Sequence, residues 1–220
     1  MNGYVMETGL GLFLLVAVVI SLTGVMSPGP MTAATIAKGY SNKNAGAWIA
    51  VGHAVIEIPL ILAIYLGFGQ IIDFPYVIKV IHIAGGLMLF YLGFRMFRTA
   101  DNAVGEIEGL PTSSLVTGIV FTGANPGFYM WWVALGTNLI VGNVSVGNVT
   151  IAGAATFGLI GVVSFALIHW LCDLAWCEFL SASTFKSRHW WTRKIRRIVF
   201  SICAFVLIGF GVWFCISLFL

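Results

Sequence analysis

Apolar runs of about 20 or more residues recur along the whole sequence, and a run of that length can cross the hydrocarbon core of a membrane as a helix. Only 9% of the 220 residues are charged, whereas a soluble domain carries about 25%. The first run is longer than a signal peptide and ends without a small-residue cleavage pattern, so we expect it to remain as a helix. The sequence therefore predicts one all-α domain over residues 1–220, a multi-pass protein of the cell membrane in contact with lipid.

Polar or proline-containing breaks divide the sequence into six predicted transmembrane helices. They cover residues 8–37, 45–70, 75–97, 113–140, 149–180 and 195–220. Loops are expected at 38–44 and 141–150, and the stretch 101–111, which holds Asp101, Glu106 and Glu108, is the predicted hinge between two halves. The halves, about 1–100 and 112–220, contain three spans each. Because an odd number of spans reverses the second half in the membrane, we expect two inverted three-helix repeats.

The first and fourth spans contain helix-breaking residues at membrane depth. The first is interrupted by Ser27-Pro28-Gly29-Pro30, and the fourth by Asn125-Pro126-Gly127. Proline removes a backbone donor and clashes with the preceding turn, so each break needs neighbouring protein or water to satisfy the freed carbonyls. A simple kink is one interpretation. The other is a binding site, because many transporters build substrate sites from broken helices near the membrane midplane.

A histidine and a carboxylate lie four residues apart in the second and fifth spans. His53 precedes Glu57, and His169 precedes Asp173, so each pair lies on one face of its helix. With a rise of about 1.5 Å per residue, both pairs fall near the middle of a core about 30 Å thick. In antiparallel helices His53 lies level with Asp173, and Glu57 with His169. Hydrogen-bonded cross-links between the helices are one explanation of the pairs. The other is proton transfer, because an imidazole and a carboxylate that titrate as a unit can hold and release a proton.

Basic residues gather at alternate connections between the predicted spans, and of the 11 Lys and Arg only Lys79 lies toward the other side. By the positive-inside rule, loops 38–44, 98–112 and 181–194 face the cytoplasm and both termini face outward. Asn143 and Asn148 each fit the N-glycosylation acceptor pattern and then face outward as well. The basic residues are scattered over helix ends, so we expect no nucleic-acid partner.

Several motifs resemble a known transporter family. Residues 22–52, with Ser27-Pro28-Gly29-Pro30 followed by Gly39, Gly46 and Gly52-His53, resemble the LysE family of small amino-acid exporters. The His53/Glu57 stretch, Asn125-Pro126 followed by Trp131-Trp132, and His169 followed by residues 173–176 are similar to its archaeal-type subgroup. The resemblance implies six helices, inverted repeats and export of amino acids or related compounds from the cytoplasm.

Our first functional hypothesis is a secondary active transporter that exports a small polar metabolite, with an amino acid as the expected substrate and protons as the coupling ion. Glu57 and Asp173, with His53 and His169 beside them, would carry protons or contact the substrate ammonium. The backbone at the two breaks would supply dipoles and carbonyls for the substrate ends. Trp131 and Trp132 would wall the site, with a packing or interfacial role as the alternative.

The second hypothesis is export of a divalent metal cation, with two imidazoles and two carboxylates as ligands: His53, Glu57, His169 and Asp173. These side chains would have to converge to within about 2.0–2.2 Å of one point. Neither hypothesis needs a cofactor. The sequence contains no serine–histidine–acid set, phosphate loop or haem motif, which argues against an enzyme. It leaves the oligomeric state open, a homodimer included.

Overall fold

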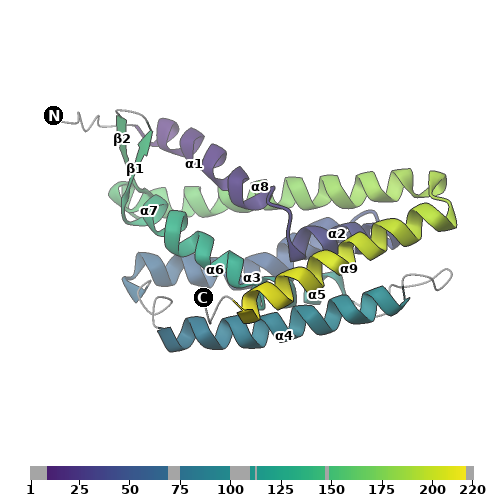
Figure 1. Cartoon of the computed structure of the whole chain (residues 1–220). Coiled ribbons are helices and arrows are strands. Elements are labelled where there is room, and N and C mark those ends of the chain that lie inside the picture. The colour runs from purple at the N-terminus through teal and green to yellow at the C-terminus, as the bar shows by residue number, and fades with distance from the viewer. Residues whose placement is uncertain (1–8, 69–74, 100–109, 112, 147–148, 217–220) are drawn as a thin grey trace.

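The structure is a computed structural model that describes residues 9–68, 75–99, 110–111, 113–146 and 149–216. The long helices run roughly along one direction of the molecule, and a small hairpin lies at one end (Figure 1). The elements in chain order are α1 (Leu10–Val25), α2 (Pro30–Ser41), α3 (Ala45–Tyr65), α4 (Pro75–Thr99), α5 (Ser114–Gly123), α6 (Pro126–Trp131), η2 (Trp132–Gly136), α7 (Thr137–Ile140), β1 (Asn143–Val146), β2 (Val149–Ala152), η3 (Ala154–Phe157), α8 (Gly158–Ser187), η4 (Arg188–Trp190) and α9 (Arg193–Ile216).

Three helical stretches in the described part of the chain are long and apolar enough to cross a membrane: Ala45–Tyr65, Ala154–Trp190 and Arg193–Ile216. The pair α1 and α2 adds a fourth if it is counted as one broken span. The chain is therefore a multi-pass membrane protein, whereas the count of six spans and the inverted repeats stay predictions. The acidic residues of the predicted hinge, Asp101, Glu106 and Glu108, lie outside the described residues.

The first predicted helix break is present. α1 ends at Val25 and α2 begins at Pro30, and the two helices are bent by 76° relative to each other. Pro30 occupies the first turn of α2, where its missing N–H costs no helical hydrogen bond. Ser27 and Pro28, between the helices, are exposed. One apolar run thus brings a helix C-terminus and a helix N-terminus together within the first predicted span.

The second predicted break separates α5 from α6. Asn125 caps α6, because its side chain accepts a hydrogen bond from the Gly127 amide at 3.1 Å, and Pro126 is the first helical residue. The helix then widens into the π-helical stretch Trp132–Gly136, which the sequence analysis did not predict. π-helical turns within α-helices frequently occur at functional sites.

Two helices extend further than predicted. α2 continues to Ser41, so residues 38–41 are helical rather than part of a loop. α8 continues to Ser187, well beyond the predicted end at residue 180. The two extensions contact each other, since a side chain at Gly39 would collide with the Ser181 backbone. Arg188 of η4, directly after α8, also donates a hydrogen bond from Nη1 to the Tyr40 carbonyl at 2.9 Å. Tertiary contacts at this end of the molecule therefore keep polar residues helical where composition alone indicated loops.

The connection before α8 is a β-hairpin and not a loop followed directly by a helix. β1 pairs with β2 in antiparallel register, with Asn143 opposite Ala152 and Val146 opposite Val149. Residues 149–152 were predicted as helix, but their β-branched Val, Thr and Ile favour a strand. The all-α prediction is thus corrected to a helical fold with one two-stranded sheet in the described part of the chain. Asn143 lies in β1, whereas Asn148 is outside the described residues.

α3 lies between α5 and α8 and meets both at small residues. A side chain at Gly52 would collide with the Leu115 carbonyl of α5, and a side chain at Gly46 with the Cys177 carbonyl of α8. Small residues let the backbones of membrane helices approach closely. This packing turns the face of α3 that carries His53 and Glu57 toward the interior, where both side chains are buried.

Candidate functional site

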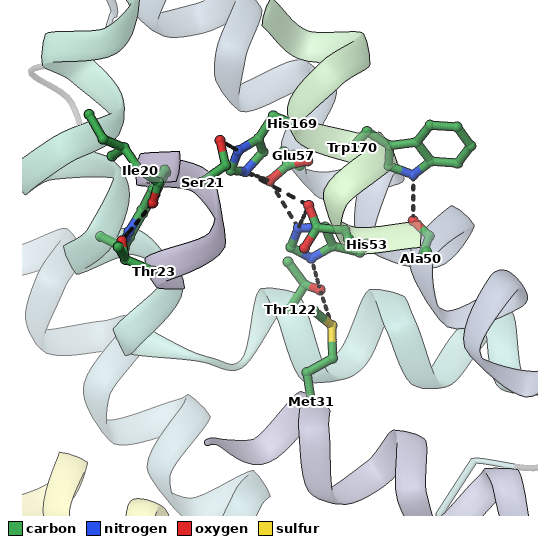
Figure 2. Close-up of polar contacts among 12 residues, drawn as sticks. Ile20, Ser21, Thr23, Met31, Ala50, His53, Glu57, Thr122, His169 and Trp170 are labelled. Atoms are coloured by element: carbon green, nitrogen blue, oxygen red, sulfur yellow. Dashed lines mark hydrogen bonds and ion pairs between the residues drawn. The ribbon is translucent and has the colours of Figure 1, made fainter. Parts of the chain in front are cut away.

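Four buried ionisable side chains from α3 and α8 meet in the interior. Figure 2 labels three of them, His53, Glu57 and His169. His53, Glu57, His169 and Asp173 are each at most 4% exposed. Glu57 Oε1 lies 2.9 Å from His53 Nε2 and 3.1 Å from His169 Nε2. The expected contact between Glu57 and His169 is therefore present, and Glu57 also bonds to the histidine of its own helix.

Asp173 differs from the predicted pairing. Its Oδ2 lies 3.8 Å from Nε2 of both His53 and His169, which is within ion-pair range but too long for a hydrogen bond. The sequence predicted two matched cross-helix pairs, whereas both imidazoles point at Glu57. α3 and α8 thus each bring a histidine to the same oxygen of Glu57. Asp173 is a second acid next to this group, and its Oδ2 makes only the longer ion-pair contacts with the two imidazoles.

Two buried hydroxyl groups contact the outer nitrogens of the imidazoles. Thr122 Oγ1 lies 2.8 Å from His53 Nδ1, and Ser21 Oγ lies 2.7 Å from His169 Nδ1. Thr122 belongs to the last turns of α5 and Ser21 to the C-terminal half of α1. Sequence reasoning missed both residues. The available signal was a hydroxyl residue in the apolar run before each proline break.

Three polar atoms around the cluster are buried without a hydrogen-bond partner among the described residues. They are Glu57 Oε2, Asp173 Oδ2 and the indole nitrogen Nε1 of Trp176. An unpaired buried polar group costs about 1–3 kcal/mol, and more if it is charged. Trp176 was not predicted as a site residue. Two acceptors and one donor near the cluster therefore make no hydrogen bond among the described residues.

A cavity of about 190 Å³ lies against these groups. Its lining includes both helix breaks, α3 and α8, and among the predicted site residues contains Ser27, Pro28, Gly29, Pro30, His53, Glu57, Asn125, Gly127, Trp131, Trp132, His169 and Asp173. Pro126 is not part of the lining and acts through the start of α6. Because pockets for drug-sized ligands measure about 300–1,000 Å³, this volume suits a small solute.

Trp131 and Trp132 form an aromatic side of the cavity and pack on one histidine. The Trp131 ring stacks on His169 with centroids 5.2 Å apart, and the Trp132 ring meets His169 edge-on at 5.3 Å. A side chain at Gly24 would collide with the Trp131 indole, so the glycine of α1 makes room for this wall. Both tryptophans therefore restrict the orientation of His169 while they bound the cavity.

The geometry of the cluster is only partly suited to a metal ion. In the described part of the chain, one group has ligand atoms close enough for a metal ion: His53, Glu57 and Asp173, within 4.8 Å of one another. Ligand atoms at about 2.0–2.2 Å from a tetrahedral zinc ion lie about 3.4 Å apart. The group would have to contract around an ion, and His169, the fourth predicted ligand, is not part of it.

A cavity that contains buried ionisable groups and is lined by two broken helices is the kind of site that secondary transporters use. The family model for LysE type translocators matches residues 22–218, from the last turn of α1 to two residues past the end of α9. The chain belongs to the LysE type translocator family. The translocator is therefore a transporter and not an enzyme, and the family indicates export of amino acids or similar small molecules. Searches of curated proteins and of solved structures returned no match.

Proposed function

We propose that the translocator exports a small amino acid from the cytoplasm in exchange for protons. The observation that carries this proposal is one cavity lined by two buried carboxylates, Glu57 and Asp173, each with an oxygen that makes no hydrogen bond among the described residues. An ammonium group has three donors and no acceptor, so two such oxygens complement it. The ammonium of the substrate binds between these two acids.

The other end of an amino acid requires hydrogen-bond donors. The first turn of α2 lines the cavity, and the unpaired amides of a helix N-terminus carry the positive end of its dipole. The Trp176 indole N–H is a further donor without a described partner. Acceptors and donors in a single small cavity favour a zwitterionic amino acid over a simple cation.

Proton coupling follows from competition for the same oxygens. A proton and a substrate ammonium both bind to the carboxylates of Glu57 and Asp173, and the neighbouring imidazoles make the four groups titrate as a unit. When the ammonium leaves, a proton taken up by the cluster prevents an uncompensated charge from remaining inside the membrane. One substrate therefore replaces one or more protons, which is the basis of exchange.

The proposed membrane arrangement is six spans in the cell membrane: α1–α2, α3, α4, α5–α7, α8 and α9. α4 has 25 residues and a length of about 37 Å, enough to cross a core of about 30 Å. The contact between Arg188 and Tyr40 joins two of the basic connections, and the hairpin lies at the opposite end of the molecule (Figure 1). This arrangement supports basic connections in the cytoplasm and both termini outside.

The test is amino-acid transport by purified protein in proteoliposomes under an imposed pH gradient. We expect the gradient to drive uptake of a labelled small amino acid, and we expect Glu57→Gln to remove the dependence on the gradient because the amide binds no proton. Glu178→Gln is the matched control, since Glu178 is an acid of α8 outside the cavity that bonds to the Ala47 amide at 2.9 Å.

Two results would contradict the proposal. The first is wild-type protein that moves none of a panel of small amino acids. The second is Glu57→Gln protein with the same gradient-driven transport as wild type, which would remove the proton role of the cluster. Loss of transport in Glu178→Gln as well would show that the effect is not specific to the cavity.

A divalent metal cation is the second candidate cargo, favoured by the approach of His53, Glu57 and Asp173 to within 4.8 Å. Isothermal titration of detergent-solubilised protein with zinc and manganese salts separates the two candidates. Heat of binding that disappears in His53→Gln would favour the metal. The amino-acid proposal predicts no such heat with the metals and predicts stabilisation by a small amino acid instead.

A further inference from the structure

Ser21 and Thr122, outside the predicted site, contact the two histidines of the cavity from the two broken helices. Ser21 is fully buried and Thr122 is 1% exposed. Ser21 of α1 contacts His169 of α8, and Thr122 of α5 contacts His53 of α3 (Figure 2). In each case the hydroxyl precedes the break of one predicted half and the histidine belongs to the other. The contact between a hydroxyl of one predicted half and an imidazole of the other therefore occurs twice, with different residues.

The hydrogen bonds at Glu57 determine whether the hydroxyls of Ser21 and Thr122 donate to the imidazoles or accept from them. Oε1 of Glu57 lies at hydrogen-bond distance from Nε2 of both His53 and His169. An ionised carboxylate only accepts, so each Nε2 bears a hydrogen. In a neutral imidazole the other nitrogen, Nδ1, is then an acceptor and requires a donor. Ser21 and Thr122 stand at that position.

A hydroxyl suits this position because it both donates and accepts. It donates to Nδ1 of a neutral imidazole and, after rotation about its C–O bond, accepts from Nδ1–H of an imidazolium. Thr122 Oγ1 also lies 3.7 Å from the Met31 sulfur of α2, a weak acceptor toward which the hydroxyl hydrogen can turn in the second state. Neither state leaves a buried ring nitrogen unpaired.

We propose that Ser21 and Thr122 are positioning residues that hold His169 and His53 with Nε2–H directed at Glu57. The proposal deepens the proposed exchange and rests on it for its role in transport. Among the described residues, the titratable groups that face either imidazole are Glu57, Asp173 and the other imidazole. α1 and α5 present the hydroxyls, and α6 and η2 present aromatic rings.

The placement of the hydroxyls gives them a role in coupling. Each is carried by the helix segment that leads into a break, so displacement of α1 or α5 withdraws it from its imidazole. The imidazole then loses the partner that fixes its tautomer, and its bond to Glu57 weakens. The two hydroxyls thus connect the arrangement of the broken helices to the hydrogen bonds of the cluster, as alternating access requires.

The test uses matched variants at both hydroxyls. Thr122→Val removes the hydroxyl at similar volume, whereas Thr122→Ser retains it, and Ser21→Ala and Ser21→Thr form the second pair. Thr117→Val is the control, because Thr117 is also buried on α5 but its hydroxyl donates to the Ser113 carbonyl of its own helix at 2.9 Å. Nitrogen-15 NMR of the imidazoles in detergent reports the tautomers directly, without transport. The pH profile of amino-acid exchange in proteoliposomes is the second readout.

We expect the hydrogen of His53 on Nε2 in wild type, and a mixture of tautomers in Thr122→Val. The exchange rate of Thr122→Val falls about tenfold, as expected for the loss of one buried hydrogen bond, and its pH profile shifts. Thr122→Ser and Thr117→Val retain the wild-type tautomer and profile. If Thr122→Val does not fold, the pair at Ser21 and the His169 signals provide the same comparison.

An unchanged tautomer and an unchanged pH profile in Thr122→Val or Ser21→Ala would overturn the positioning role. Failure of the proposed function has a different signature: wild-type protein would move no amino acid, while the NMR comparison would still decide whether the hydroxyls set the tautomers. A loss of exchange in Thr122→Ser equal to that in Thr122→Val would also contradict the proposal, because the hydroxyl is present there.

Discussion

Oε1 of Glu57 accepts hydrogen bonds from two imidazoles that reach it from different helices. An isolated ionised carboxylate at the centre of a membrane helix costs about 2.5–3.5 kcal/mol on insertion scales. Hydrogen bonds to charged groups contribute about 1.5–3 kcal/mol each, so two of them offset this cost. The other oxygen of the same carboxylate makes no hydrogen bond among the described residues, and Glu57 lines the cavity. A single side chain therefore joins α3 to α8 and keeps one oxygen without a hydrogen-bond partner among the described residues.

Glu57→Ala tests this double role in stability. We expect it to lower the free energy of unfolding by about 2–5 kcal/mol, because two buried ring N–H groups lose their acceptor. Glu57→Gln should cost clearly less, since an amide oxygen has two lone pairs and can still accept from both imidazoles. Denaturant unfolding in detergent measures the difference, and equal losses in the two variants would contradict the bridging geometry.

The elements that carry the site are fixed by close helix crossings. Gly52 of α3 lies against the Leu115 carbonyl of α5, and Gly118 of α5 lies against the Ile49 carbonyl of α3. The crossing lies one residue before His53, on the same stretch of α5 that carries Thr122. The distance between these backbones therefore determines whether the hydroxyl of Thr122 reaches His53.

Gly52→Ala should destabilise the protein by about 1–3 kcal/mol, because its methyl group overlaps the α5 backbone. Gly209→Ala is the matched control: it is also within a helix, it has nothing within 4 Å of an added Cβ, and alanine favours helix by about 1 kcal/mol over glycine. Thermal unfolding in detergent should separate the two variants. If Gly52→Ala were as stable as Gly209→Ala, the described crossing of α3 and α5 would be wrong.

For the whole molecule, the proposed orientation in the membrane rests on the distribution of the basic residues. The ends of α2 and α8 and the start of α9 lie together at one end, and the hairpin lies at the other (Figure 1). The cavity is lined by residues from the helix breaks and from the middle of α3 and α8 rather than from either end. Under the proposed function, a substrate bound in this cavity is reached in turn from the two sides of the membrane.

Single-cysteine variants test the orientation in intact cells. In a background with the four native cysteines replaced by alanine, Asn143→Cys on the hairpin should react with a membrane-impermeant maleimide added outside. Lys194→Cys, at the exposed start of α9, should react only after the membrane is permeabilised. The reverse labelling pattern would place the hairpin in the cytoplasm and contradict the proposed direction of export.

Sequence reasoning brought His53, Glu57, His169 and Asp173 together because their depth could be counted along two helices from the loops. The same reasoning located both proline breaks, since proline and glycine act on the local backbone. It did not locate the hairpin at 143–152 or the helical residues 38–41. In a chain this apolar, hydropathy distinguishes strands, loops and helices poorly. The conformations of residues 143–152 and 38–41 depend on tertiary contacts, which the sequence does not show.

The sequence also could not predict which carboxylate each histidine of the cluster contacts. Counting residues along a helix gives depth but neither rotation about the helix axis nor side-chain rotamers. Rotation decides how closely Asp173 of α8 approaches His53 of α3, and the rotamer decides whether His53 turns to Glu57 of its own helix. That rotation is set by glycine crossings such as Gly52 on Leu115. Ser21 and Thr122 were missed for the same reason, because each is one hydroxyl among several in its apolar run.

The most direct test of exchange at the cluster is proton movement coupled to substrate, measured with a pH-sensitive dye inside proteoliposomes. Vesicles loaded with a small amino acid are diluted into medium without it, with no pH gradient imposed. We predict that outflow of the amino acid through wild-type protein acidifies the lumen and that Glu57→Gln abolishes this acidification. Amino-acid outflow through wild-type protein with no change in lumenal pH would contradict proton exchange at the two carboxylates.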